Sequence, residues 1–253
     1  MSTPILQIKD LHKSFGTKKV HQGVSLELYE AESIALLGGS GSGKSVLLRE
    51  IIGLERLDKG EIYYKDQRID QLSEDELFPI RTHISYAFQS GALFDSSTVF
   101  ENISYPLIEH SKLTYPEIQQ RVSQMLELID LKGIEKLMPS DLSGGMQKRV
   151  GMARAIILGP DIVLYDEPTA GLDPSNTDNV VQLMKRLKKR GLASIFVTHD
   201  IPAAIDLCDR ILILHEGKIY FNEPTSKFLE STDPIVTKFH LTLNINTKRG
   251  LNA

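Results

Sequence analysis

The stretch Gly38-Gly-Ser-Gly-Ser-Gly-Lys44-Ser45 decides the fold of this chain of 253 residues. It matches the pattern G-x-x-x-x-G-K-[ST] at every defined position. The apolar run Ser33-Ile-Ala-Leu-Leu37 precedes it, as expected for a strand buried on both faces, and helical apolar spacing follows from Val46 to Leu54. A strand, a glycine-rich loop and a helix in this order predict a site for the phosphates of a nucleotide.

Each residue type in this loop has a physical task in binding phosphate. Glycines let backbone N–H groups converge on phosphate oxygens, and the N-terminus of the next helix adds the positive end of its dipole. Lys44 is expected to reach the β- and γ-phosphates, and the Ser45 hydroxyl is expected to ligate Mg²⁺. The predicted phosphate-binding residues are Gly38, Gly39, Ser40, Gly41, Ser42, Gly43, Lys44 and Ser45.

A second apolar strand, Ile162 to Tyr165, ends in the adjacent acids Asp166 and Glu167. Successive side chains of a strand point to opposite faces, so the two acids can take different tasks. We expect Asp166 to support the Mg²⁺ shell and Glu167 to polarise an attacking water as general base. Alone, an acidic pair after a strand is usually a solvated turn. Behind a phosphate-binding loop, it is the expected second half of a nucleotide-hydrolysis site.

The segment Leu142-Ser-Gly-Gly-Met-Gln147 opens a helix that is predicted to run through Ile157. Ser143 is a good N-cap, but Gly144 and Gly145 weaken the first turn of a helix and need a reason. Exposed N–H groups at a helix start bind anions, so this segment is a second predicted phosphate-binding device. The alternative is that it is only an inefficient helix start.

The remaining pattern predicts one α/β domain with an insertion. Short antiparallel strands are expected from Ile5 to Gly38, and mainly helical spacing fills about residues 98–158. Later strands at 193–198 and 211–215 alternate with a helix, which favours a parallel sheet. The predicted domain covers residues 1–234, and the tail 235–253 shows no clear pattern.

Bulk properties exclude several classes of protein. A net charge of -4 and an isoelectric point near 6.0 give no general attraction for nucleic acid. The single cysteine, Cys208, cannot form an internal disulfide and fits a reducing compartment. The first ten residues lack the pattern of a signal peptide, and no apolar run approaches the roughly 20 residues needed to cross a bilayer.

The phosphate-binding loop, the Leu-Ser-Gly-Gly-Met-Gln segment and the Asp-Glu strand, in that order, resemble the nucleotide-binding subunit of ABC transporters from Ile5 to about Ser231. The resemblance implies a P-loop NTPase ABC ATPase fold. This α/β fold has a mixed RecA-like core sheet, an N-terminal antiparallel β subdomain and an inserted helical subdomain. It also implies an ATPase that uses Mg²⁺ and forms a head-to-tail dimer, in which Ser143, Gly144 and Gly145 of one copy close over ATP on the other.

Further site residues follow from the resemblance. Phe15 resembles the aromatic that stacks on adenine, although a lone phenylalanine is more often core. Gln89 resembles the glutamine that touches Mg²⁺ and water and senses the membrane partner. His199, after an apolar strand, resembles the switch histidine that contacts the γ-phosphate and orients Glu167 and water.

Two more positions are matched to the same family. Asp173 resembles the acid that crosses the dimer interface, and its alternative is a helix cap before Pro174. Val46 stands near the α-phosphate, where many members carry a second hydroxyl residue. We expect this departure to cause a small loss of binding, because Lys44, Ser45 and the loop amides make the main contacts.

Three stretches narrow the resemblance to the ATPase of Mla-type, MCE-associated lipid transport systems: 41–48, 88–103 and 142–151. The resemblance implies phospholipid cargo and a peripheral location on the cytoplasmic face of the inner membrane. It also implies a membrane permease, an MCE-domain substrate-binding protein and a small cytoplasmic regulatory subunit as partners. The segment 90–103 is the predicted lining of a groove for a permease helix, and the alternative for its residues Leu93, Phe94, Val99 and Phe100 is local core. Ser97 departs from the leucine expected in the Mla-type pattern.

Three alternatives remain open from the sequence. The chain could serve an ABC transporter for another cargo, such as an amino acid or another solute. It could be a soluble ABC ATPase acting on ribosomes or DNA, although it has neither a second cassette nor a long coiled-coil insertion. It could be a small-molecule kinase, but that function does not explain residues 143–146.

Overall fold

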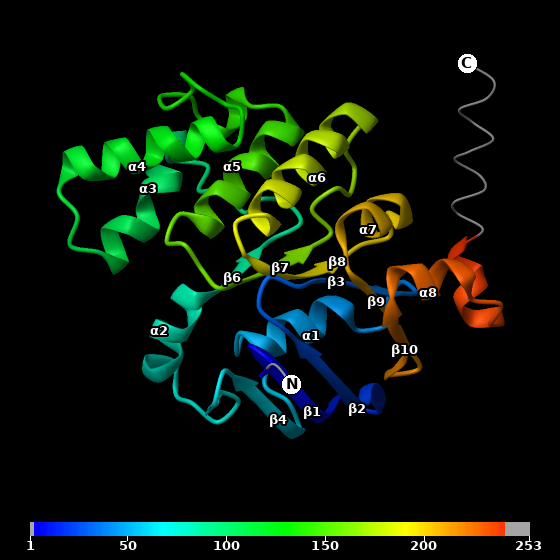
Figure 1. The fold of residues 1–253 in the computed structure, drawn as a ribbon. Helices are drawn as coiled ribbons and strands as arrows, with labels where there is room; N and C mark the ends of the chain where they lie inside the picture. The colour runs from blue at the N-terminus through cyan, green and yellow to red at the C-terminus, as the bar shows by residue number, and fades with distance from the viewer. Residues whose placement is uncertain (1–2, 241–253) are drawn as a thin grey trace, which may run out of the picture.

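The computed structural model describes residues 3–240 and contains two sheets with helices between and around them (Figure 1). The smaller sheet is antiparallel where its strands pair, in the order β2-β1-β4-β5. Its strands are β1 (Leu6–Phe15), β2 (Lys18–Leu28), β4 (Lys59–Tyr64) and β5 (Gln67–Arg68). This sheet is the predicted N-terminal antiparallel subdomain.

The larger sheet is mixed and has the strand order β10-β9-β3-β8-β7-β6. Its strands are β3 (Ser33–Gly38), β6 (Ile84–Ala87), β7 (Ile162–Asp166), β8 (Ala193–Val197), β9 (Arg210–His215) and β10 (Lys218–Pro224). All neighbouring pairs from β9 to β6 are parallel, and only β10 is antiparallel to its neighbour. The predicted fold class is therefore confirmed.

Alternating side chains of the central strands build two cores. Ile34 and Leu36 of β3 pack into one core with helix α1 (Lys44–Ile51) and the antiparallel sheet. Ala35 and Leu37 belong to the core on the opposite face. Because both faces are covered, β3 has no exposed side chain, which explains its continuous apolar run.

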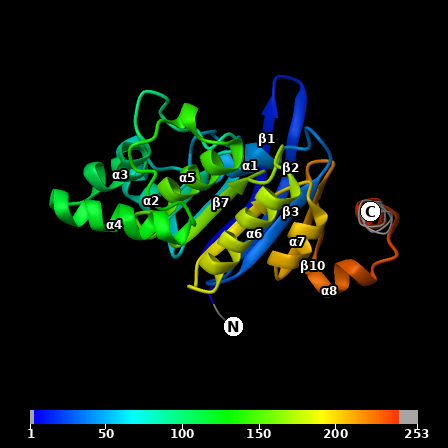
Figure 2. The same cartoon turned by 90° about the horizontal axis from the view of Figure 1, so that it is seen from above.

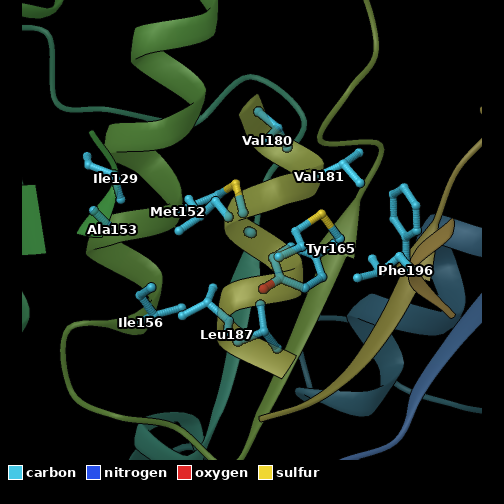
Figure 3. Close-up of a cluster of buried hydrophobic side chains, with 14 of the residues drawn as sticks. Ile129, Met152, Ala153, Ile156, Tyr165, Val180, Val181, Leu187 and Phe196 are labelled. Atoms are coloured by element: carbon cyan, nitrogen blue, oxygen red, sulfur yellow. The ribbon is translucent and has the colours of Figure 1, made fainter. Parts of the chain in front are cut away.

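Most other helices lie on the face of the large sheet opposite α1 or at its β6 end (Figures 1 and 2). Helices α5 and α6 pack on β7 and β8 through Met152, Ala153, Tyr165, Val181 and Phe196 (Figure 3). The helices are α2 (Glu74–His83), α3 (Val99–His110), α4 (Tyr115–Leu128), α5 (Gly144–Ile156), α6 (Pro174–Lys188), α7 (Ile201–Leu207) and α8 (Thr225–Glu230).

Helices α3 and α4 extend beyond the β6 edge of the large sheet in both views (Figures 1 and 2). They fall in the range predicted to be a helical insertion. Helix α3 begins at a capping box in which Thr98 and Glu101 satisfy each other's backbone N–H groups. Among residues 3–240, no helix combines the length and apolar character needed to cross a bilayer.

The start of the tail is structured, whereas the sequence pattern of 235–253 gave no prediction of structure there. Residues 234–240 are helical. The side chain of Asp233 accepts hydrogen bonds from the backbone N–H groups of Ile235 and Val236, at 2.8 and 3.3 Å, and so caps this helix. Val236 is fully buried and His240 packs edge-on against Phe228, so tertiary contacts stabilise a short segment whose periodicity alone is weak. Residues 241–253 lie outside the described part of the chain.

Candidate active site

Four neighbouring parallel strands of the large sheet end at the same edge, and each carries predicted site residues there. The phosphate-binding loop follows β3, and His199 follows β8. Asp166 ends β7 and Glu167 comes next, while Gln89 follows β6. Since β3, β8, β7 and β6 are adjacent in this order, the fold gathers residues far apart in sequence at the carboxyl ends of the strands.

The loop between β3 and α1 needs its glycines for two physical reasons. Gly41 and Gly43 have φ angles of 71° and 104°, a region that strongly favours glycine. A Cβ atom on Gly38 would lie 2.7 Å from the carbonyl oxygen of Leu214, so no side chain fits there. The loop therefore has the backbone shape of a phosphate cradle.

Lys44 lies at the base of this cradle with its ammonium group turned inward. Its Nζ donates hydrogen bonds to the carbonyl oxygens of Gly38 and Gly39, at 3.0 and 3.2 Å. Burial lowers the pKa of the Lys44 ammonium, and the carboxylates of Glu167 and Asp166 act in the opposite direction. A triphosphate would add negative charge beside this desolvated cation, so the position suits a phosphate ligand.

A pocket of about 600 Å³ on the Asp166 side brings the three predicted metal ligands together. It is lined by Ser45, Gln89 and Asp166 among others. The Ser45 hydroxyl donates a 2.8 Å hydrogen bond to Asp166 Oδ1. A hydroxyl, an amide and a carboxylate are the hard oxygen donors that Mg²⁺ prefers, with substrate phosphates completing its shell. The residues therefore fit Mg²⁺.

Two residues at this pocket carry no signal in the sequence. The Tyr86 hydroxyl donates a 2.6 Å hydrogen bond to Asp166 Oδ2, the carboxylate oxygen that Ser45 leaves free. Burial raises the pKa of Tyr86 well above its ordinary value, so its hydroxyl remains a donor. Lys148 also lines the pocket and donates to the carbonyl oxygen of Ala170. Both contacts depend on the packing of distant segments, which periodicity does not reveal.

Glu167 and His199 meet on the other side of the loop. Their Oε1 and Nε2 atoms lie 3.2 Å apart, and His199 Nε2 is 3.4 Å from Lys44 Nζ. Glu167 has a φ angle of 49°, which is uncommon for a residue with a side chain. Its backbone N–H donates to the carbonyl oxygen of Val197 at 2.9 Å, which holds this conformation at the end of β8. Other residues of the described structure, such as Glu216, share this conformation in turns, so it is the contact with His199 that distinguishes Glu167.

These catalytic groups line a pocket of about 480 Å³ together with the predicted nucleotide-binding residues. Its lining includes Phe15, residues 40–46, Glu167 and His199. Phe15 is 45% exposed, which argues against a core role for its ring. Lys13 Nζ lies 4.8 Å from one face of that ring. Phe15 is thus placed at the pocket where a base could stack.

Six predicted site residues do not line either pocket: Gly38 and Gly39 at the start of the loop, and Ser143, Gly144, Gly145 and Asp173 elsewhere on the chain. The Ser143 hydroxyl accepts from the backbone N–H of Met146 at 3.3 Å, as a helix cap does. A Cβ on Gly145 would lie 2.3 Å from the side chain of Asn176, whereas a Cβ on Gly144 would meet nothing within 4 Å. Packing within one chain therefore explains Gly145 but not Gly144.

Asp173 has a structural task within the single chain. It caps α6, accepting from the backbone N–H and the side-chain amide of Asn176 at 3.0 and 2.6 Å. These hydrogen bonds lower the pKa of the Asp173 carboxyl, with the backbone bond as the main cause. The alternative role as a helix cap is thus realised, and any role across a dimer interface stays a prediction.

The order of motifs and their gathering at one sheet edge agree with a comparison to known families. The sequence profile of the ABC transporter family matches residues 21–170, which is more than half of the chain. The chain belongs to the ABC transporter family. It is an ATP-binding and ATP-hydrolysing subunit of this family, as the sequence predicted.

Curated relatives of this ABC ATPase cover nearly its whole length. It is 40% identical to Protein TRIGALACTOSYLDIACYLGLYCEROL 3, chloroplastic, of Arabidopsis thaliana, over 94% of this chain and 74% of that protein. It is 37% identical to the intermembrane phospholipid transport system ATP-binding protein MlaF of Escherichia coli, over 93% and 88%. It is 40% identical to the probable ribonucleotide transport ATP-binding protein mkl of Mycobacterium leprae, over 92% and 68%.

Solved structures of ABC cassettes share its fold. One is a dimeric ATP-binding cassette in a post-hydrolysis state with ADP and Pi, with a TM-score of 0.81 and 33% identity over 87% of this chain and 98% of that one. Another is cbiO1 from Clostridium perfringens, part of the ABC transporter complex cbiONQ. Its TM-score is 0.82, and it is 28% identical over 96% of this chain and 97% of that one.

Proposed function

We propose that this ABC ATPase drives the movement of phospholipid between membranes of a cell envelope. The observation that carries the proposal is the match over 93% of this chain to MlaF, which is named as the ATP-binding protein of an intermembrane phospholipid transport system. The mycobacterial relative mkl is instead named as a probable ribonucleotide transport protein. A ribonucleotide is therefore the second candidate cargo. In this proposal the membrane partners carry the cargo, and the two pockets at the strand ends serve the nucleotide and Mg²⁺.

The site residues divide the work of hydrolysis. The loop 38–45 holds the triphosphate through backbone N–H groups and the Lys44 ammonium. Glu167 accepts the proton of the attacking water, and His199 orients Glu167 and the terminal phosphate. Ser45, Gln89 and Asp166 would hold Mg²⁺, which would neutralise charge that develops on the phosphates. This arrangement supplies positioning and charge stabilisation, the two things that phosphoryl transfer rewards most.

The site is completed by a second copy of the chain. Gly144 is exposed and has no neighbour that forbids a side chain, so its own fold does not require glycine there. A phosphate arriving at the start of α5 would require it, because a close approach to backbone N–H groups excludes a Cβ. A related cassette bound to ADP and Pi is dimeric. A head-to-tail dimer of this chain would bring the two surfaces together.

A groove of about 340 Å³ next to the Gln89 loop is the proposed contact with a helix of the membrane permease. Phe88, Phe94 and Tyr105 line it and are each more than 40% exposed. Of the segment 90–103 predicted to line it, Gly91 and Phe94 do so, whereas Val99 is fully buried in the core. This contact would place the ATPase on the cytoplasmic face of the inner membrane as a peripheral subunit. An MCE-domain protein and a small regulatory subunit are further proposed partners.

The cargo is tested in the assembled transporter. The chain is purified from its native cells with the membrane subunits that accompany it, bound lipids are identified, and the complex is placed in vesicles. We expect phospholipid to co-purify and to raise ATP turnover several-fold, because cargo binding favours closure of the dimer. The Glu167→Gln complex serves as the control for contaminating ATPases. Stimulation by a ribonucleotide or an amino acid, without any by phospholipid, contradicts the proposed cargo.

Removing the Tyr86 hydroxyl is expected to weaken Mg²⁺ binding, and so to raise the Mg²⁺ concentration that turnover requires, without destroying the site. In Tyr86→Phe, Asp166 loses a hydrogen bond that fixes its carboxylate, and losses of this kind cost about 10-fold in metal affinity or activity. The measurement is the Mg²⁺ concentration that gives half-maximal ATPase activity, which should rise by roughly that factor.

Tyr63→Phe is the matched control for Tyr86→Phe. Tyr63 also donates to a carboxylate, Glu61 at 3.0 Å, but on the antiparallel sheet away from both pockets. Its removal should leave the Mg²⁺ requirement unchanged. Equal Mg²⁺ curves for the two variants would show that Tyr86 does not position Asp166.

A further inference from the structure

A histidine and a glutamate are buried directly behind the phosphate-binding loop, where the hydrolysis mechanism does not use them. His21 lies on β2 and Glu50 on α1, and they are only 1% and 2% exposed. His21 Nδ1 is 2.9 Å from Glu50 Oε2, within ion-pair distance, although the angles fall outside those of a hydrogen bond. A buried polar pair of this kind usually costs stability compared with an apolar pair, so its presence needs a reason.

The other ring nitrogen of His21 contacts the loop itself. His21 Nε2 lies 3.2 Å from the carbonyl oxygen of Gly43, which also accepts the backbone N–H of Leu47 at 2.9 Å. A Cβ on Gly43 would come within 2.7 Å of His21 Nε2 and 2.6 Å of Val20. The imidazole therefore packs tightly under the residue that precedes helix α1.

This contact bears on phosphate binding through the geometry of one peptide bond. The carbonyl of Gly43 and the N–H of Lys44 belong to the same planar trans peptide, so they point in opposite directions. Both residues line the nucleotide pocket. Holding the Gly43 carbonyl against His21 and Leu47 consequently turns the Lys44 N–H away from them, toward the phosphate side of the loop.

Glu50 lies where it can favour a hydrogen on His21 Nε2, which this contact needs. An ionised Glu50 favours an imidazolium, and a protonated Glu50 beside Nδ1 favours a neutral imidazole with its hydrogen on Nε2. Either state leaves Nε2 protonated, and the two states hold the same number of protons. Burial raises the pKa of the Glu50 carboxyl, and the contact with His21 acts in the opposite direction.

We propose that His21 is a positioning residue for ATP binding, which holds the Gly43 carbonyl through Nε2 while Glu50 sets its protonation. The inference rests on the proposed assignment of residues 38–45 as the ATP-binding loop. It predicts an effect on nucleotide affinity rather than on the chemical step, because neither side chain reaches the catalytic pocket.

The test replaces both partners in the full chain. A buried ion pair exchanged for apolar residues is often neutral or stabilising, so His21→Leu with Glu50→Leu should keep or raise the melting temperature. Its Kd for MgATP, measured with a fluorescent nucleotide analogue, should rise about 5-fold, the effect of one lost hydrogen bond. The kcat should change less than about 2-fold. In His21→Gln with Glu50→Leu, the amide nitrogen stands near the place of Nε2 and should recover most of the affinity.

His12→Leu is the matched control, since His12 pairs with Asp10 at 2.9 Å on the neighbouring strand but is solvent-exposed. It should bind MgATP as the wild type does. The inference is overturned if His21→Leu with Glu50→Leu (the leucine pair) binds MgATP with wild-type affinity. It is also overturned if His21→Gln with Glu50→Leu does not recover that affinity. If the leucine pair does not fold, ¹⁵N spectra of the wild-type histidines decide. A neutral His21 protonated on Nδ1 overturns the inference, and a protonated Nε2 that shifts with MgATP supports it.

The test of His21 and the test of the ATP-binding loop can fail independently. Normal ATP binding in Lys44→Ala would refute the assignment of the loop. Lost binding in Lys44→Ala together with wild-type affinity in the leucine pair would refute only the role of His21.

Discussion

The Glu167→Gln variant is expected to bind ATP with wild-type affinity, to form a stable dimer and to hydrolyse ATP about 10² to 10⁴ times more slowly, the usual contribution of a general base. The amide keeps the size of the side chain and its place 3.2 Å from His199, but it cannot accept the proton of water. The substitution should therefore lower kcat and leave the affinity for ATP unchanged. Phosphate release under saturating ATP measures it, and chromatography with MgATP shows the dimer.

Glu216→Gln is the control for this substitution. Glu216 has nearly the same backbone conformation, with a φ of 48° against 49° for Glu167, but it lies in the turn between β9 and β10. It should turn over ATP normally, which shows that an amide at such a backbone position is harmless in itself. Normal turnover by Glu167→Gln would refute its assignment as the general base.

Lys44→Ala is expected to weaken ATP binding by about 100-fold, because each hydrogen bond to a charged group contributes about 1.5–3 kcal/mol and a lysine can make more than one. The fold should tolerate the change, since the desolvated ammonium bonds only to the Gly38 and Gly39 carbonyls and His199 in the described structure. Equilibrium binding of MgATP measures the loss, and the melting temperature without nucleotide checks the fold.

Lys59→Ala serves as the control for Lys44→Ala. Lys59 is well exposed and pairs with Asp10, so its removal takes away a lysine charge without touching either pocket. It should bind ATP normally. Undiminished binding in Lys44→Ala would contradict the loop assignment, whereas loss of binding in both variants would point to a general effect of charge.

Local patterns were sufficient to predict which residues lie together at the ends of the strands. The loop 38–45, the Asp166–Glu167 pair and His199 each follow an apolar run, and a parallel sheet places the ends of such runs at one edge. The family resemblance added Phe15, Gln89 and the role of His199, and the structure places all three at the two pockets. Here sequence and structure agree because the information lies within a few residues.

Contacts between distant segments could not be predicted in this way. The hydrogen bond from Tyr86 to Asp166 depends on the pairing of β6 with β7, and His21 meets Glu50 only because α1 packs beneath β2. Similarly, Val99 follows the exposed groove residue Phe94 by five positions, yet it lies in the core. Hydropathy and periodicity alone do not show that Phe94 is exposed and Val99 buried, because this depends on how the helices pack.

The measurement that tests the account most directly is a crystal structure of Glu167→Gln with MgATP. We expect two copies related by a two-fold axis, with each triphosphate held by the loop 38–45 of one copy. On its other side, the backbone N–H groups of residues 143–145 of the opposing copy should contact it, and Gly144 should make the closest approach. Isolated copies whose triphosphate meets no residue from 143 to 145 would contradict the proposal that a second chain completes the site.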